Sequence, residues 1–313
     1  MPAATARILV TGADGQLGRS LQALAAHKPG SAVYDFVTRA QLDITDGSAI
    51  DRWLDAHPAD YVINAAAYTA VDRAATDMDA ALAVNAHAPG LLARGCAARG
   101  MHLLHVSTDY VFDGALDRAY RDTDAPCPLN AYGRSKLLGE QAVQDAAPDA
   151  IIVRTSWVFS AWGGNFVRTM LRLGAQHDRL RVIDDQIGGP TWAGHLAEAL
   201  HRLALHAHGA VATASPSSAP GGVYHFAGSP WVSWHGFAQE IFAQALRLGL
   251  IPRLPAVEAI PSSDWPAPEP RPANSRLDCS RLEALLGPLE RDWRTGLDEV
   301  LRAISRYNGA LSI

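Results

Sequence analysis

The chain has 313 residues, enough for two domains of roughly 150 residues each or for one enlarged α/β unit. Its 48% of hydrophobic residues against 19% of charged ones allows a large packed core and excludes a disordered chain. The net charge of −5 argues against nucleic acid as a partner, because contacts to a phosphate backbone require a basic face.

Short apolar runs alternate with helical-length segments through the first half of the chain. The runs fit strands buried on both faces, and they are Ile8–Val10, Ala32–Val37, Tyr61–Ile63, Leu103–Val106 and Ile151–Val153. The segments between them are rich in Ala, Leu and Gln, and they are Gln16–His27, Asp46–Ala56, Asp72–Arg99 and Ala131–Asp145. This alternation predicts an α/β fold with a Rossmann-like, doubly wound parallel sheet.

The second half of the chain is less regular. Gly163-Gly164, Gly188-Gly189-Pro190 and Pro261–Pro272 interrupt it. A strand is predicted over Val223–Phe226 and a helix over Trp234–Leu248. The segment Leu205–Gly222, which precedes this predicted strand, is poor in large apolar groups and rich in Ala, Ser, Pro and Gly. We therefore expect that segment to be a surface loop.

Three glycines follow the first predicted strand. Gly12, Gly15 and Gly18 stand at GxxGxxG spacing between that strand and a helix. Such glycines permit a tight turn, a close approach of backbone to a pyrophosphate, and close packing of helix on strand. We therefore expect residues 1–155 to form an NAD(P)-binding Rossmann domain. Residues 156–313 would mainly form a smaller C-terminal substrate-binding lobe, with some segments able to return to the first domain.

A tyrosine and a lysine share one face of a predicted helix. Tyr132 and Lys136 are four residues apart, which brings the phenol and the ammonium together. A nearby ammonium and a cationic oxidised nicotinamide would both favour the phenolate and lower the pKa of Tyr132 from its usual value of about 10. Such a tyrosine can exchange a proton with a carbonyl or alcohol oxygen. The alternative is an exposed pair on a solvated helix.

Hydroxyl groups follow the predicted strand Leu103–Val106. Ser107 and Thr108 stand at its carboxyl end, where open α/β sheets bind their ligands. Thr108 precedes Tyr132 by 24 residues and can serve the same substrate oxygen. The alternative is an ordinary turn in which the hydroxyl bonds to nearby backbone.

These motifs together resemble a known family. The glycine loop, the segment Ser107–Gly114, the segment Pro128–Lys136 and Asn85 are similar to the extended short-chain dehydrogenase/reductases. More narrowly, four blocks resemble the dTDP-4-dehydrorhamnose reductases, and these are Asn64–Asp72, Arg154–Phe159, Asp184–Thr191 and Arg271–Leu277. The resemblance extends from Arg7 to the last predicted helix, and the later blocks are much more specific than GxxGxxG.

The resemblance implies a role for each matching position. Catalysis would fall to Thr108, Tyr132 and Lys136. The cofactor would contact the loop residues Gly12, Gly15, Gln16, Leu17 and Gly18, then Asp43 and Ile44, then Ala67, Tyr68 and Thr69, and also Tyr132 and Lys136. The sugar nucleotide would meet Thr108, Asp109, Trp157, Arg271, Asn274 and Arg276. Trp157 could instead simply pack at the end of a strand. The neighbouring Arg154 could instead serve only as a salt-bridge partner.

The residues after the second strand bear on the choice of cofactor. An acidic residue there normally binds the adenine ribose and repels a 2′-phosphate. Here the positions are Thr38 and Arg39, and Arg39 can form charge-assisted hydrogen bonds to that phosphate. We therefore expect NADPH. NADH remains the alternative, in which Arg39 faces solvent and Asp35 or Asp43 holds the ribose.

No metal-binding pattern is present in the sequence. His102 and His105 are three apart on a strand and face opposite sides. Some members of the family are described as binding magnesium at a carboxylate-lined dimer contact, but the matching positions here are Ser20 and Gly194. We therefore expect no metal, and the resemblance leaves a homodimer open.

The remaining expectations concern location. No window approaches the roughly 18 apolar residues of a membrane span, so we expect no membrane partner. The three cysteines are scattered without a CxxC spacing, which is typical of reduced thiols in a cytoplasmic protein.

The activity that the resemblance implies is reduction of the 4-keto group of dTDP-4-dehydro-L-rhamnose to dTDP-L-rhamnose by hydride transfer from NAD(P)H, a step in supplying rhamnose for cell-surface polysaccharide. Two alternatives remain. One is a sugar-nucleotide epimerase or dehydratase, which uses the same tyrosine and lysine but keeps its NAD tightly bound. The other is a non-enzymatic regulatory subunit of the kind that partners methionine adenosyltransferase.

Overall fold

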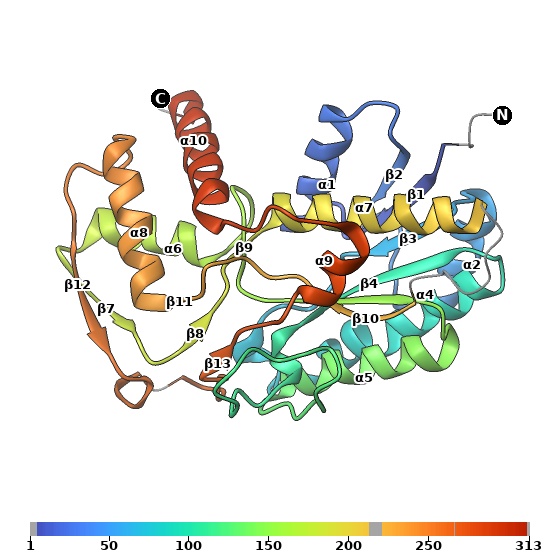
Figure 1. Cartoon of the computed structure of the whole chain (residues 1–313), viewed down its shortest axis with the longest axis horizontal. Helices are drawn as coiled ribbons and strands as arrows, with labels where there is room; N and C mark the ends of the chain where they lie inside the picture. The colour runs from blue at the N-terminus through green and yellow to red at the C-terminus, as the bar shows by residue number, and fades with distance from the viewer. Residues whose placement is uncertain (1–4, 213–220, 266, 312–313) are drawn as a thin grey trace.

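The computed structural model describes residues 5–212, 221–265 and 267–311, and a parallel sheet forms its centre (Figure 1). Six strands lie in the order β10-β5-β4-β3-β1-β2, with every neighbouring pair parallel. They are β1 (Arg7–Thr11), β2 (Val33–Val37), β3 (Tyr61–Asn64), β4 (His102–Thr108), β5 (Ile151–Thr155) and β10 (Gly222–His225). All six strands predicted from the sequence are confirmed.

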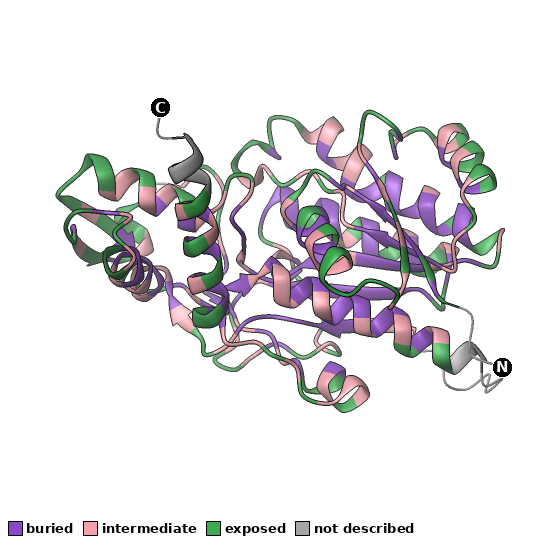
Figure 2. Cartoon of the chain, turned by 90° about the horizontal axis from the view of Figure 1, so that it is seen from above, coloured by how far each residue is buried: buried purple, intermediate pink, exposed green. Residues whose placement is uncertain are grey.

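Helices cover both faces of the sheet, as a doubly wound fold requires. One face carries α1 (Gln16–His27), α7 (Ala193–Ala212) and α9 (Ser280–Leu286), and the other carries α2 (Gly47–Ala56), α4 (Ala88–Ala97) and α5 (Ala131–Ala146). Successive residues of β1 alternate between the two cores, with Ile8 and Val10 on the α1 side and Leu9 on the α2 side. Figure 2 shows the buried strands between exposed outer helix faces.

The strand order fixes where a ligand can bind. From β1 the chain moves outward to β2, then crosses to β3 on the other side of β1. The connections that follow β1 and β3 therefore leave the sheet in opposite directions, and they open a crevice at the carboxyl ends of these strands. Open α/β sheets bind ligands at such a switch point.

A second, smaller lobe lies beside the carboxyl edge of the sheet (Figure 1). It contains short strands and helices, namely β6 (Val158–Phe159), α6 (Phe166–Gln176), β7 (Arg179–Ile183), β8 (Ile187–Gly188), β9 (Thr191–Trp192), β11 (Val232–Ser233), α8 (Trp234–Arg247), β12 (Ala256–Ile260), β13 (Asn274–Ser275) and α10 (Trp293–Leu311). A separate core centred on Phe159, Phe237 and Leu297 holds it together. Three segments of the second half, α7, β10 and α9, return to the large sheet.

The continuous helix predicted over Asp72–Arg99 is wrong. The structure has a 3₁₀ turn at Val71–Arg73 (η1), α3 (Met78–Leu82), a π-helical turn at Ala83–His87 (η2) and then α4. Pro89 explains the wide turn, because proline has no N–H to donate to the carbonyl of Asn85 four residues earlier. Composition favoured helix throughout and did not reveal this interruption.

The surface loop predicted over Leu205–Gly222 is also wrong in its first part. Helix α7 continues to Ala212, Ala207 is only 4% exposed, and the ring of His208 meets Tyr61 of β3 edge-on. Small residues and histidines fit this helix because it lies close against the sheet. Residues 213–220 lie outside the described part of the chain.

This correction carries a prediction. Deleting 207–218 is expected to lower the free energy of unfolding by about 1–3 kcal/mol. The deletion removes Ala207 from the core and so uncovers buried surface of the sheet. The measurement is the thermal unfolding midpoint beside that of the intact chain. An unchanged midpoint would show that Ala207 and its neighbours contribute nothing to the core.

No helix in the described part of the chain is both long and apolar enough to cross a bilayer.

Candidate active site

A cavity of about 1130 Å³ opens where the sheet meets the second lobe. Its volume exceeds the roughly 300–1,000 Å³ typical of ligand pockets, which suits two ligands better than one. The walls come from the carboxyl ends of β1, β3, β4 and β5, from α5, and from the second lobe. The predicted site residues that line it are Gly12, Gly15, Gln16, Leu17, Arg39, Asp43, Ile44, Ala67, Tyr68, Thr69, Thr108, Asp109, Tyr132, Lys136, Trp157 and Arg271.

The glycine loop forms one end of this cavity. Gly12 has φ +72°, and a Cβ there would lie 2.7 Å from the backbone nitrogen of Ala66, in the loop after β3. A Cβ on Gly18 would lie 2.3 Å from the carbonyl oxygen of Gly12, so Gly18 lets α1 pack against the loop although it does not line the cavity. Gly15 directly precedes α1, whose N-terminal N–H groups suit a pyrophosphate. These contacts fit a dinucleotide cofactor.

Asn85 holds the loop that follows β3. Its Oδ1 accepts a hydrogen bond from the Tyr68 backbone N–H, and its Nδ2 donates to the Tyr68 carbonyl, both at 2.9 Å. The same Nδ2 donates to Ser135 Oγ on α5 at 3.1 Å. The side chain therefore fixes the cavity wall at Tyr68 relative to the helix that carries Lys136. The wide turn described above places Asn85 for this work.

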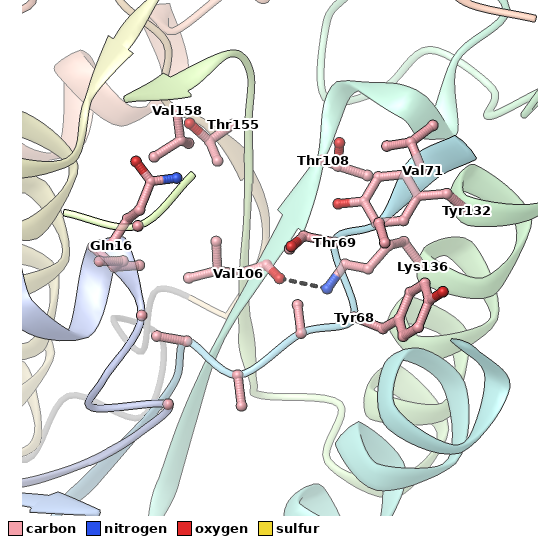
Figure 3. A pocket seen from close by; sticks show the side chains of 18 of the residues that line it. Gln16, Tyr68, Thr69, Val71, Val106, Thr108, Tyr132, Lys136, Thr155 and Val158 are labelled. Atoms are coloured by element: carbon pink, nitrogen blue, oxygen red, sulfur yellow. Dashed lines mark hydrogen bonds between the residues drawn. The ribbon is translucent and has the colours of Figure 1, made fainter. Parts of the chain in front are cut away.

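The predicted catalytic residues come together at one wall (Figure 3). Asn130 caps α5 by accepting a hydrogen bond from the Gly133 N–H, so Tyr132 and Lys136 lie in the first two turns. Thr108 lies at the end of β4, and Lys136 Nζ donates to the Val106 carbonyl at 2.8 Å. Tyr132 is 9% exposed and Lys136 2% exposed. The alternative of a solvated pair is therefore excluded.

Burial sets the protonation of both groups. It raises the pKa of Tyr132 to about 12, although the Thr108 hydroxyl acts in the opposite direction. In the protein without bound cofactor the pKa of Tyr132 is therefore raised and not lowered, because desolvation and the nearby Asp109 outweigh the Thr108 hydrogen bond. Burial also lowers the pKa of Lys136 to about 8. Tyr132 thus carries its proton at neutral pH and can act as an acid.

Thr108 forms the predicted local turn and also borders the cavity. Its hydroxyl accepts from the Tyr110 N–H at 3.2 Å, which is the predicted local turn, and donates to Asp109 Oδ1 at 3.1 Å. It also lines the cavity. Asp109 is 3% exposed, and its burial raises the pKa of the carboxyl to about 6. A polar substrate therefore meets a hydroxyl and a carboxyl that are already oriented.

Trp157 has an unusual backbone conformation. Its φ of +48° lies in the left-handed region, which bulky side chains rarely adopt. The indole stacks on Trp234 of the second lobe with ring centroids 3.4 Å apart, and both rings line the cavity. Arg154 instead forms a buried ion pair with Glu140 of α5 at 2.6 Å, so its salt-bridge alternative is confirmed.

The adenine end of the cavity carries Arg39, Asp43 and Ile44. The Asp43 carboxylate accepts hydrogen bonds from the backbone and hydroxyl of Thr45, at 3.0 and 2.8 Å, and the backbone bond lowers the pKa of its carboxyl. Arg39 is exposed and borders the cavity. One carboxylate oxygen of Asp43 is thus used by its own turn, while the exposed guanidinium of Arg39 is available to a ligand in the cavity.

The three substrate candidates of the second lobe, Arg271, Asn274 and Arg276, lie in different surroundings. Arg271 lines the cavity and pairs with Asp72 at 2.8 Å. Asn274 instead donates to the carbonyls of Leu116 and Arg118, and its Oδ1 accepts from Arg276. Neither Asn274 nor Arg276 lines the cavity. Their side chains fasten the loop after β4 to the second lobe.

Two further hydroxyls belong to the site: Ser107, which the sequence placed at the strand end, and Thr155, which sequence reasoning missed. Ser107 and Thr155 are buried beside the cavity, and the side-chain oxygen of each has no hydrogen-bond partner. Buried hydroxyls usually find partners, so both are suited to ligand contacts. Thr155 pairs with Thr108 in the register of β4 and β5, and that register could have revealed it. Within the described ranges no three His, Cys, Asp or Glu side chains form a metal-binding group.

Comparisons with known proteins agree with this geometry. The family model of the RmlD substrate binding domain matches residues 6–306. A dTDP-4-dehydrorhamnose reductase from Aggregatibacter actinomycetemcomitans is 41% identical over 94% of this chain and 98% of its own length.

Solved structures show the same likeness. A dTDP-4-dehydrorhamnose reductase from Bacillus anthracis, solved in complex with NADP, has a TM-score of 0.84 and 31% identity, over 96% of this chain and all of that one. A UDP-glucose 4-epimerase from Thermus thermophilus, complexed with NAD, has a TM-score of 0.75 but only 16% identity over 96% of this chain and 99% of its own, and therefore shares the fold alone. The chain belongs to the dTDP-4-dehydrorhamnose reductase family.

Proposed function

We propose that this protein reduces the 4-keto group of dTDP-4-dehydro-L-rhamnose to the alcohol of dTDP-L-rhamnose, with NADPH as the hydride donor. One observation carries the proposal. A buried, protonated Tyr132 shares a cavity with Lys136, with Thr108 and with a glycine loop that fits a dinucleotide, in a chain of this reductase family. The product supplies rhamnose for cell-surface polysaccharide.

The residues divide the work of reduction. Bound NADPH supplies the hydride. Tyr132 gives its proton to the C4 oxygen as negative charge develops there, and Thr108 orients that oxygen by hydrogen bonding. Lys136 holds the cofactor ribose through the N–H groups that Val106 does not engage. Because Tyr132 is protonated in the free protein, the site is prepared for the reductive direction.

The sugar nucleotide would lie between the sheet and the second lobe. Asp109 contacts the sugar hydroxyls, and Trp157, stacked on Trp234, offers an aromatic face beside them. Arg271 is the candidate for the diphosphate, because its planar guanidinium can bind two phosphate oxygens once Asp72 releases it.

The decisive experiment follows NADPH oxidation with enzymatically generated dTDP-4-dehydro-L-rhamnose, with the product identified by mass spectrometry and NMR. Stoichiometric formation of dTDP-L-rhamnose is the expected result. Purified protein that carries stoichiometric NAD and consumes no NADPH would instead indicate an epimerase or dehydratase. Co-purification with methionine adenosyltransferase, without keto-sugar reduction, would indicate a regulatory subunit.

Arg39→Ala should reduce the preference for NADPH over NADH. Arg39 borders the adenine end of the cavity, and a charge-assisted pair with the 2′-phosphate is worth about 1.5–3 kcal/mol, or roughly 10- to 100-fold in the ratio of kcat/KM values. The measurement is kcat/KM for both cofactors in both proteins. Arg73→Ala, at another cavity-lining arginine, is the matched control. An unchanged ratio in Arg39→Ala would remove Arg39 from cofactor selection.

A further inference from the structure

A row of buried polar side chains reaches Lys136 from behind the cavity. Thr11 Oγ1 donates to Asn64 Oδ1 at 2.8 Å, and Asn64 Nδ2 lies 3.1 Å from His105 Nδ1. His105 Nε2 in turn lies 3.4 Å from Lys136 Nζ. Asn64 and His105 are both 0% exposed, and neither lines the cavity. His105 therefore meets the cavity through Lys136, whereas Asn64 also contacts the backbone of Ala66 in the cavity wall.

One backbone amide decides how this row is oriented. The Ala66 N–H donates to Asn64 Oδ1 at 3.2 Å, so the amide oxygen of Asn64 must face Ala66. The Thr11 hydroxyl can donate or accept, and it adapts to either orientation. The NH₂ group of Asn64 then faces His105 and must donate to Nδ1. A neutral His105 therefore carries its proton on Nε2, the nitrogen nearest Lys136.

His105 remains neutral in this position. Its burial, reinforced by the positive charge of Lys136, holds the pKa of the imidazole well below its usual range. The Nε2–H group points at the Lys136 amino group, which can accept it only as a neutral amine. An ammonium would present N–H against N–H at that contact. Its remaining N–H groups are thus directed to the Val106 carbonyl and to the cavity.

We propose that His105 is a positioning residue for Lys136: held in one tautomer by Asn64, it turns the N–H groups of Lys136 toward the cavity and weakens the hold of Lys136 on its proton. This inference rests on the proposed function only in taking Lys136 as the residue that binds the cofactor. It assigns a purpose to a histidine that the reaction itself does not touch.

Other charged groups also lie near Lys136, and they are unchanged when His105 is replaced. Glu140, one turn further along α5, raises the pKa of Lys136, and Arg154 of β5 is paired with that carboxylate. Asp109 faces Tyr132 and raises the pKa of its phenol. Because these groups are retained in variants at position 105, a change in the titration of Lys136 reports on the imidazole.

Two variants separate the contacts of the two ring nitrogens. His105→Gln places an amide where Nε2 stood, free to turn its oxygen toward Lys136. His105→Asn keeps an acceptor for Asn64 but does not reach Lys136. The readout is NADPH affinity, followed by cofactor fluorescence across about pH 7 to 10, a range that contains the pKa of Lys136 near 8. Affinity should be high below that pKa and fall above it, as the ammonium is lost.

We call the pH at which NADPH affinity begins to fall the pH break, and both His105 variants are expected to shift it upward. In His105→Gln the break should move upward by about one pH unit, a tenfold gain in proton affinity, because the amide oxygen accepts from the ammonium. His105→Asn should give a smaller upward shift. Lys136→Met should abolish the break, which assigns it to Lys136.

Several outcomes would overturn the proposal. A break that stays at the same pH in both folded variants means that His105 only fills space, and a uniform loss of affinity at every pH means the same. If both variants fail to fold, Asn64→Asp provides the second test, because its carboxylate would draw the imidazole proton to Nδ1 and should also raise the break. These measurements need no sugar nucleotide. A failure to reduce the keto-sugar would therefore contradict the proposed function without deciding the role of His105.

Discussion

Tyr132→Phe is expected to lower kcat by about 10²- to 10⁴-fold while leaving NADPH affinity nearly unchanged. The phenol supplies the proton for the C4 oxygen, and loss of a positioned acid costs a factor of that size. The ring itself is retained, and it is the ring that packs in the cavity wall beside Tyr110, with centroids 5.4 Å apart. Steady-state kinetics with keto-sugar and NADPH, together with a binding titration, give both numbers.

Tyr110→Phe is the matched control for this prediction. It removes a hydroxyl from the neighbouring ring, which also borders the cavity. Its kcat should fall far less than that of Tyr132→Phe. Equal losses in the two variants, or wild-type turnover without the Tyr132 hydroxyl, would reject Tyr132 as the acid.

Breaking the buried ion pair between Arg154 and Glu140 is expected to cause a large loss of stability. Its side chains are 4% and 3% exposed, and two hydrogen bonds of 2.9 and 2.6 Å join them. Arg154→Met leaves the Glu140 carboxylate buried without its partner, which is expected to destabilise the fold by about 3–5 kcal/mol. Urea unfolding of the variant and the intact chain measures the loss.

The double variant Arg154→Met/Glu140→Leu tests the cause of that loss. Removing both charges eliminates the unpaired carboxylate, so most of the lost stability should return. If the double variant is as unstable as the sum of the single ones, packing rather than charge explains the effect. The Lys136 titration described above is a second readout, because Glu140 acts on that group.

Local patterns predicted the parts of this molecule that local physics determines. The strand Ile8–Val10, the helix Gln16–His27 and the glycines between them were found because burial on both faces and a tight turn leave a signature in a few adjacent residues. The pairing of Tyr132 with Lys136 was found for the same reason, since a helix turn is a local repeat.

Contacts between distant segments explain what the sequence did not reveal. The position of Asn274 outside the cavity lining follows from the bonds of its amide to the carbonyls of Leu116 and Arg118, over 150 residues away. The pKa of Tyr132 is raised because the surrounding fold removes the phenol from water. The spacing of Tyr132 and Lys136 in the sequence carries no information about that burial. The π-helical turn at Asn85 could not be foreseen without knowing that the side chain of Asn85 binds Tyr68 and Ser135.

The repeated passage of the chain between the sheet and the second lobe has a mechanical consequence. The backbone leaves the sheet after β5, returns as α7, reaches β10 at the sheet edge, leaves again for β11 and comes back as α9 before ending in α10. A domain tethered by one linker can swing freely, whereas here several connections would have to bend in concert. We therefore expect the walls of the cavity to keep nearly the same separation when ligands arrive. Ligand binding should then proceed without a slow closing step, because little movement of the lobes is needed.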